Sequence, residues 1–311
     1  MRIARPTSAV LVLAALTLSA CGGQGSPESE SGATPAEGFP GTVTDARGEV
    51  TLDTAPERIV SLSPSSTEML FAIGAGDQVT AVDEYSNFPE EAPVTDLSGF
   101  TPSVEAISEH DPDLVVLARE AEETAEQLEQ IDVPVLVMPA AVTLDDTYAQ
   151  MRLLGEATGH ANEAAQAAGE VEAEVDGIVE AAREEIGDTD LSYYHELDDG
   201  MYSVTSDTFI GQIYAEFGLT NIADSVDDTA GGYPQLSAEY IVEQDPDLVF
   251  LAYGGADAAD DLADRPAFDG IAAARNGDIV ELDPDIASRW GPRVTDLAAS
   301  VAEAVTAADQ G

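Results

Sequence analysis

Histidine side chains are the first candidates for metal binding and proton transfer in this sequence, and the chain has three of them. His195 begins an acidic run that ends at Asp199, whereas His110 and His160 stand far from it in the sequence. Zinc hydrolases commonly place two histidines four residues apart on a helix, with a glutamate directly after the first, and that spacing does not occur here. We therefore expect no metal site, and we interpret His195, at the end of a predicted strand, as a structural residue.

The signatures of other enzyme classes are missing as well. Each of the 11 basic side chains is an arginine, which excludes a phosphate-loop lysine, a Schiff-base lysine and a lysine general base. The sequence has no Gly-x-Ser-x-Gly nucleophile elbow. Gly74-Ala75-Gly76 follows a predicted helix, whereas a dinucleotide fingerprint opens one. We expect a protein that is not an enzyme and has no cofactor.

Charge and cysteine content exclude further classes. The 61 acidic side chains leave a formal net charge of −50, and a surface of that sign repels a nucleic-acid backbone. Such a surface is screened at molar salt, where the Debye length is about 3 Å, so it suits a saline exterior; drift in composition is the alternative explanation. A single cysteine excludes an intramolecular disulfide and any structural zinc site with two thiolates from this chain.

The first 20 residues explain the position of that cysteine. Two arginines precede a nearly continuous apolar run, and small residues follow up to Cys21. The run has about half of the roughly 20 residues that a membrane-spanning helix needs. It resembles a bacterial lipoprotein signal, so we expect residues 1–20 to be cleaved on export and Cys21 to be lipidated. Residues 21–38, rich in Gly, Ser, Glu and Pro, then form a flexible tether.

An internal repeat organises the rest of the chain. The segment Ser103–Ala118 returns 134 positions later as Ser237–Ala252, with eleven of sixteen residues identical. Each copy has the pattern of a short helix with a serine cap, a stop at an Asp-Pro-Asp turn, and an apolar run of strand length. A helix followed by a strand is one unit of a mostly parallel sheet. Its recurrence at domain-sized spacing predicts two similar lobes rather than a solenoid.

The α/β alternation continues around both copies. We expect further strands at 58–63, 79–82, 135–138, 192–195 and 279–282, and further helices at 65–74, 120–130, 145–158, 208–217 and 293–307. A capping box of Ser65 with Glu68 would open the 65–74 helix. Between the lobes, Asn162–Ile186 is an unbroken helical pattern about 37 Å long at 1.5 Å per residue.

The predicted fold is therefore α/β, with two mostly parallel-sheet lobes joined by one long helix. The lobes span 39–160 and 188–311, and the connecting helix spans 161–187. A coiled-coil dimer through the alanine-rich face of this helix is the alternative, but the stretch is isolated and we expect a monomer.

The sequence is similar to one family from about Gly41 to Val305, nearly all of the mature domain. The similarity is carried by the segments Arg58–Glu68, Gly74–Asp77 and Tyr85–Pro89. They resemble the substrate-binding proteins of bacterial cobalamin and ferric-siderophore ABC importers, and the cobalamin branch more than the siderophore branch. The resemblance implies a ligand cleft between the lobes that holds a bulky metal chelate, which is passed to a permease and its ATPase.

The resemblance also implies the residues of the ligand site. Strand ends and adjoining loops face the cleft in this family, which agrees with the general rule for ligands of open α/β sheets. The matching positions are Ser63, Pro64, Ser65, Tyr85, Phe100, Tyr233, Asp285 and Arg289. Trp290 departs from the family pattern, and we interpret it as structural.

Glu105 and Glu239 hold equivalent places in the two copies of the repeat. Each matches a glutamate with which this family docks against arginines of the permease. Two equivalent anionic points on pseudo-symmetric lobes suit two cationic pockets on a two-fold partner. The sequence thus predicts permease docking through both residues.

Together these features predict a lipid-anchored substrate-binding protein on the outer face of the cell membrane, with cobalamin as its ligand. A ferric siderophore and haem are the alternative ligands within the family. A surface adhesion module and a metal-dependent enzyme are the alternatives from other functional classes. We expect a permease, an ATPase and a small-molecule chelate as partners, and no nucleic acid.

Overall fold

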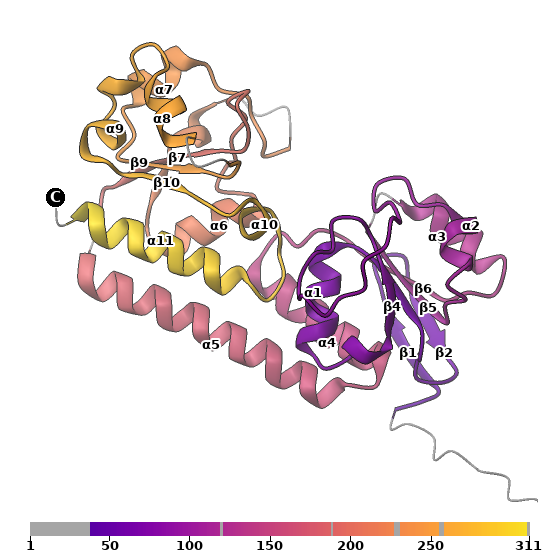
Figure 1. Cartoon of the computed structure of the whole chain (residues 1–311). Helices are drawn as coiled ribbons and strands as arrows, with labels where there is room; N and C mark the ends of the chain where they lie inside the picture. The colour runs from indigo at the N-terminus through magenta and orange to yellow at the C-terminus, as the bar shows by residue number, and fades with distance from the viewer. Residues whose placement is uncertain (1–37, 119–120, 188, 227–230, 255–257, 310–311) are drawn as a thin grey trace, which may run out of the picture. The chain divides into compact units, whose positions relative to one another are not determined.

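Two four-stranded parallel sheets, one in each half, organise the described part of the chain (Figure 1). The computed structural model describes residues 38–118, 121–187, 189–226, 231–254 and 258–309. The expected signal peptide, Cys21 and the expected tether up to residue 37 lie outside the described residues. Among the helices within these ranges, none is both long and apolar enough to cross a membrane.

The first sheet has the strand order β4-β3-β5-β6, and all its strands run parallel. Helices cover both faces of this sheet, and an apolar core lies between the sheet and the helices on each face. Strands that are buried on both faces are nearly continuous hydrophobic runs, as these are. The strands are β3 (Ile59–Leu62), β4 (Val79–Val82), β5 (Leu114–Ala118) and β6 (Val135–Met138). The helices are α1 (Pro64–Ala72) and α4 (Leu144–Thr158) on one face, and α2 (Val104–Ser108) and α3 (Glu122–Glu129) on the other.

The second sheet has the order β10-β9-β7-β8 and is also fully parallel. Its strands are β7 (Ser192–Glu196), β8 (Thr220–Asn221), β9 (Leu248–Leu251) and β10 (Ile279–Glu281). The helices around it are α6 (Phe209–Glu216), α7 (Ala238–Gln244), α8 (Ala258–Ala263), α9 (Ala272–Asn276), α10 (Pro284–Ser288) and α11 (Val294–Asp309). Short 3₁₀ turns lie at Gly76–Gln78, Ile222–Ser225 and Phe268–Gly270.

The two sheets share one topology. When the strands of each lobe are numbered in chain order, both sheets follow the order 2-1-3-4. The repeated segment supplies the helix before the third strand and that strand itself in each lobe. The structure thus confirms the predicted α/β fold with two similar lobes.

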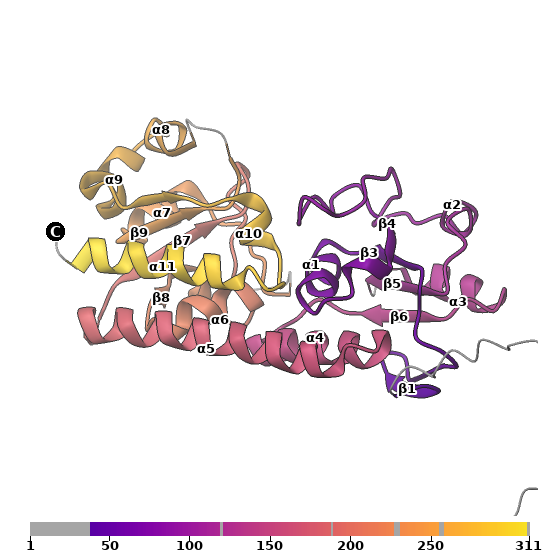
Figure 2. The ribbon, with the colours of Figure 1, turned by 60° about the horizontal axis from the view of Figure 1, so that its bottom comes forward.

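One helix of 26 residues, α5 (Ala161–Ile186), connects the lobes. It packs along α4 of the first lobe and α11 of the second, as both views show (Figures 1 and 2). Its early alanines, Ala164 and Ala168, enter the core of the first lobe, whereas Val175 and Val179 enter that of the second. The predicted connecting helix is confirmed.

The start of α1 differs from its prediction. The cap is Ser63, whose hydroxyl accepts a hydrogen bond from the Ser66 N–H at 3.5 Å, and Pro64 occupies the first helical position, which suits its fixed φ. The predicted capping box of Ser65 with Glu68 is therefore wrong. The Glu68 carboxylate binds two arginines instead, a stronger attraction than a backbone N–H offers.

A short antiparallel hairpin was not anticipated from the sequence. It consists of β1 (Gly41–Thr44) and β2 (Glu49–Leu52). Asp45, in its turn, accepts a hydrogen bond from the backbone N–H of Val137 at 2.8 Å. This bond fastens the hairpin to β6.

Candidate functional site

The first three predicted ligand residues lie at the junction of β3 and α1: Ser63 is the N-cap of α1, and Pro64 and Ser65 lie in its first turn. Ser63 and Ser65 are buried, and Pro64 between them is partly exposed. The Ser65 hydroxyl accepts a hydrogen bond from the backbone N–H of Trp290 at 3.2 Å, from the far end of the chain. Residues 63–65 therefore contact the C-terminal segment, and among them the ring of Pro64 is the side chain that remains partly exposed.

Two exposed aromatic rings lie side by side after β4. Tyr85 is 52% exposed and Phe100 is 77% exposed, and their ring centroids lie 5.5 Å apart in an edge-to-face arrangement. Large apolar rings that remain in water while they touch each other form a ready surface for a flat ligand. The structure brings together these two residues, which the sequence predicted separately.

A buried carboxylate holds the backbone of Tyr85 in place. Asp83 is 2% exposed and accepts hydrogen bonds from the Tyr85 N–H and the Ser86 hydroxyl, both at 2.8 Å. Burial raises the pKa of the Asp83 carboxyl above its ordinary value, and these hydrogen bonds oppose that rise. Ser86 in turn bonds Thr67 of α1 at 2.9 Å, so the Tyr85 loop is anchored to the first lobe.

Asp285 and Arg289 lie at the other end of the chain, on α10 and at its C-terminal cap. Arg289 Nη2 lies 2.7 Å from Asp285 Oδ1, and Asn87 donates a hydrogen bond to Asp285 Oδ2 at 2.7 Å. Arg289 is 8% exposed and also contacts Glu68 at 2.9 Å. The pair therefore lies beside the Tyr85 loop, with the guanidinium largely enclosed by protein partners.

Tyr233 belongs to the second lobe, in a loop between β8 and α7. Residues 202–205 and 232–235 of this lobe pair through backbone hydrogen bonds and an isolated bridge between Tyr202 and Gln235. Tyr233 is 43% exposed and Tyr202, which the sequence analysis did not single out, is 41% exposed. In the described residues no ring contact joins Tyr233 to Tyr85 or Phe100.

A charged cluster that the sequence analysis missed lies at the carboxyl end of β7. Glu196 is fully buried and receives two hydrogen bonds from Arg265, at 2.7 and 2.9 Å, and one from the Tyr253 hydroxyl. The only advance signal was that Glu196 directly follows the strand predicted at 192–195; the observed strand includes it. Because the pairing is bidentate and buried, it ties the segment after α8 to the sheet.

His195 is structural, as interpreted from the sequence. It is fully buried in β7, and its Nδ1 lies 2.8 Å from the Tyr214 hydroxyl. Burial lowers the pKa of His195 to about 3, so the imidazole is neutral at physiological pH. Within the described ranges, no group of three or more His, Cys, Asp or Glu side chains is placed to hold a metal ion.

Glu105 and Glu239 occupy matching positions on α2 and α7. Ser103 and Ser237 cap these helices by accepting hydrogen bonds from the backbone N–H groups of Ala106 and Tyr240. Each glutamate lies in the first turn of its helix, and its side chain is exposed. The repeat therefore presents two equivalent carboxylates on the surface.

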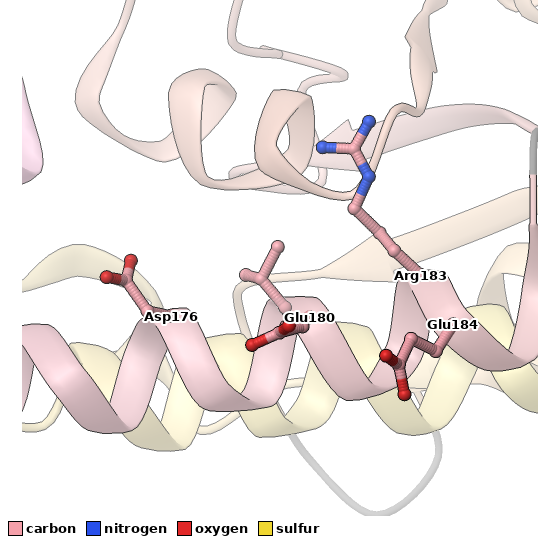
Figure 3. Close-up of a pocket in the computed structure, with 5 residues that line it drawn as sticks. Asp176, Glu180, Arg183 and Glu184 are labelled. Carbon is pink, nitrogen blue, oxygen red and sulfur yellow. The ribbon is translucent and has the colours of Figure 1, made fainter.

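The surface recess along α5 is a poor site for a cargo. It is lined by Asp176, Val179, Glu180, Arg183 and Glu184, all from one helix (Figure 3). Arg183 points away from the acidic side chains, toward a neighbouring segment, and donates a hydrogen bond to the Glu216 carbonyl at 3.0 Å. The recess has no aromatic side chain and only one wall, so it cannot enclose a large molecule.

Sequence comparison places the chain among binding proteins. Residues 59–286 match the family model described as periplasmic binding protein. The chain is 30% identical over 306 residues to an uncharacterized ABC transporter substrate-binding lipoprotein of Bacillus subtilis, with 96% of this chain and 95% of the relative covered. It is 32% identical over 321 residues to a cobalamin-binding protein of Halobacterium salinarum, with 98% and 85% covered.

Solved structures share the fold. A periplasmic heme-binding protein of Roseiflexus sp. superposes with a TM-score of 0.71 at 25% identity, covering 82% of this chain and 99% of the other. A periplasmic vitamin B12-binding protein of Vibrio cholerae gives 0.70 at 22% identity, with 82% and 99% covered.

Proposed function

The chain belongs to the periplasmic binding protein family, and from this premise we propose that it is the extracytoplasmic cobalamin-binding component of an ABC importer. Proteins of this family bind a ligand and do not transform it, so the chain is not an enzyme and uses no cofactor. The ligand site would be formed by the loops and first helical turns that follow the carboxyl ends of the strands, which include the predicted residues. The loops of the two lobes would hold the cargo between them.

The observation that favours cobalamin over an anionic iron chelate or haem is that the described arginines already have partners within the protein. Each arginine in the described ranges contacts a carboxylate or a backbone carbonyl: Arg47, Arg58, Arg152, Arg183, Arg265, Arg275, Arg289 and Arg293. Ferric catecholates and the propionates of haem are anionic and need free cations. Cobalamin is a broad macrocycle with little net charge, which suits exposed rings such as Tyr85 and Phe100.

Delivery and location complete the proposal. Glu105 and Glu239 would bind arginines of the permease, whose ATPase supplies the energy of transport. The apolar run of about ten residues is too short to span the bilayer, so lipid on Cys21 would hold the protein on the outer face of the cell membrane. The protein would act there as a monomer. The relative described as a lipoprotein supports this location.

A titration tests the choice of ligand. The full chain with Cys21→Ser is titrated with cyanocobalamin, a ferric catecholate, a ferric hydroxamate and haem, and binding is followed by ligand absorbance and by Trp290 fluorescence. The backbone N–H of Trp290 donates a hydrogen bond to Ser65, one of the predicted ligand residues, so Trp290 emission should respond when a ligand occupies the site. We expect one cyanocobalamin per chain with a Kd of roughly 1 μM or lower, and at least about tenfold weaker binding of the other three.

The other outcomes decide between the alternatives. Tighter binding of an iron chelate or of haem would replace cobalamin as the ligand within the same family. No response to any of the four would contradict the proposal and favour a surface adhesion module.

A further inference from the structure

A buried carboxylate on α1 joins the two ends of the chain. The Glu68 side chain is 1% exposed, and two arginines from the C-terminal segment bind it. Arg289 Nη1 lies 2.9 Å from Glu68 Oε1, whereas Arg293 donates to Oε1 at 2.6 Å and to Oε2 at 3.1 Å. The hydrogen bond to Glu68 raises the pKa of Arg293 above its ordinary value. A carboxylate shared by two guanidinium groups and shielded from water is a strong, direction-specific attachment.

Arg289 extends this attachment to the Tyr85 loop. Its Nη1 donates to Asn87 Oδ1 and its Nη2 donates to the Tyr85 carbonyl, both at 2.9 Å. Asp83 holds the N–H of the same residue. The Tyr85 backbone is therefore held on one side by its own lobe and on the other by the C-terminal segment.

The rest of the segment fits closely against the first lobe. Trp290 contacts the cores of both lobes, its indole N–H donates to Gln150 Oε1 at 3.2 Å, and its carbonyl accepts from the Thr147 hydroxyl at 3.0 Å. A Cβ added at Gly291 would lie 3.0 Å from Glu68 Oε2. Glycine thus permits the close approach that the ion pairs need.

We propose that Glu68 is a positioning residue of the ligand site, which fixes the Tyr85 loop of the first lobe to the C-terminal segment of the second through Arg289. The mechanical link follows from the contacts alone, whereas its effect on a ligand rests on the proposed function. Neutralising Glu68 leaves two arginines without their shared partner, so the segment separates from α1 and the Tyr85 ring loses its fixed place.

The mechanical link is tested without any ligand. In the full chain with Cys21→Ser, spin labels are attached to Glu126→Cys on α3 and Glu243→Cys on α7, both exposed positions. The chain has no other cysteine, so only these two sites carry a label. We expect Glu68→Gln to broaden the distance distribution between the labels at least about twofold. Glu91→Gln, an exposed glutamate in the same recess beside Glu68, should leave the distribution unchanged.

The effect on binding is tested by a double-mutant cycle with cyanocobalamin as the probe. Glu68→Gln should weaken binding about tenfold when Tyr85 is present and less than about twofold in the Tyr85→Ala background, because the positioned ring is then absent. A purely structural role of Glu68 would lower the melting temperature without such coupling.

An unchanged distance distribution together with additive effects on binding would overturn the proposal. If Glu68→Gln does not fold, Arg289→Gln, which removes the contact to the Tyr85 loop and keeps the Arg293 pair, is measured in the same way. If the parent chain binds no cyanocobalamin, the proposed function fails, and the spin-label distances still decide whether the link exists.

Discussion

The carboxylate of Asp113 accepts a hydrogen bond from the backbone N–H of Arg58 at 2.8 Å, which joins the start of β5 to the start of β3. Asp247 makes the equivalent contact in the second lobe, where it accepts from the Ser192 N–H at 2.9 Å and from the Ser192 hydroxyl at 2.7 Å. The last aspartate of each Asp-Pro-Asp turn thus sets the register of the first and third strands. This role explains in physical terms why both copies of the repeat have the residue.

Removing either aspartate should destabilise its own lobe. Asp113→Ala and Asp247→Ala leave backbone N–H groups without a charged acceptor, so each should lower the free energy of unfolding by about 2 kcal/mol. The two sites lie in different lobes, and their effects should add in the double variant. Urea denaturation followed by circular dichroism measures this, with Asp96→Ala, an exposed aspartate, as the control. A loss below about 0.5 kcal/mol would show that the contacts do not set the register.

The exposed ring pair should matter for binding and little for stability. Tyr85→Ala and Phe100→Ala each remove a ring at the proposed ligand surface, and we expect each to weaken cyanocobalamin binding about tenfold. The unfolding free energy should change by less than about 0.5 kcal/mol because both side chains are largely in water. Calorimetric titration checks the affinity, and Val94→Ala, 99% exposed on the same long loop, is the matched control. Binding equal to the parent in both variants would place the ligand elsewhere.

Charge reversal on the two docking glutamates should separate transport from ligand binding. Glu105→Arg or Glu239→Arg sets a cation against the cationic pocket expected on the permease, so uptake of labelled cobalamin in cells should fall about tenfold for each. The repeat also supplies the control, since Glu109 and Glu243 are an equivalent exposed pair on the same two units. If Glu109→Arg and Glu243→Arg reduce uptake equally, the general charge of the surface would be responsible rather than a docking site.

Much of the fold was predictable because its signals are local. The limits of β4 and β6 agree with their predicted ranges, since each is an apolar run bounded by turn residues. The long helix and the two serine caps were visible for the same reason. The hairpin β1–β2 was missed because its four-residue strands alternate weakly and depend on Asp45 binding a strand far along the chain.

The site was predictable in its parts and not in its connections. Tyr85 and Phe100 were candidates by resemblance, but nothing in the sequence shows that their rings touch. Arg289 was expected to face the ligand, and its contact with Glu68 lies 221 residues away. A capping box fits the local spacing around Glu68, whereas the tertiary ion pair decides the actual contact. Pairing between such distant charges has no periodic pattern that a single sequence could reveal.

Cys21 should determine where the protein is found. Cys21→Ser removes the thiol that would be lipidated, and the exported chain should move from the membrane fraction to the soluble exported fraction. Because each buried methylene contributes about 0.8 kcal/mol, loss of the acyl chains removes nearly all membrane affinity. Fractionation with immunodetection measures the distribution, and Ser26→Ala, in the segment expected to be a tether, is the control. Retention of Cys21→Ser in the membrane would mean that another feature anchors the chain.

Acid should destabilise the folded chain partly through His195. Its pKa is about 3 in the folded state, where it is buried, and about 6.5 when unfolded, so between these values the unfolded chain binds a proton that the folded chain does not. Stability contributed by the neutral histidine is therefore present above pH about 6.5 and is lost as pH falls toward 3, by up to about 1.4 kcal/mol per pH unit. Urea denaturation between pH 6 and pH 4 should show a slope that is smaller by this amount in His195→Gln. Tyr214→Phe removes the hydrogen-bond partner and keeps the buried histidine, so it should retain the steeper slope; equal slopes in the parent and His195→Gln would contradict the prediction.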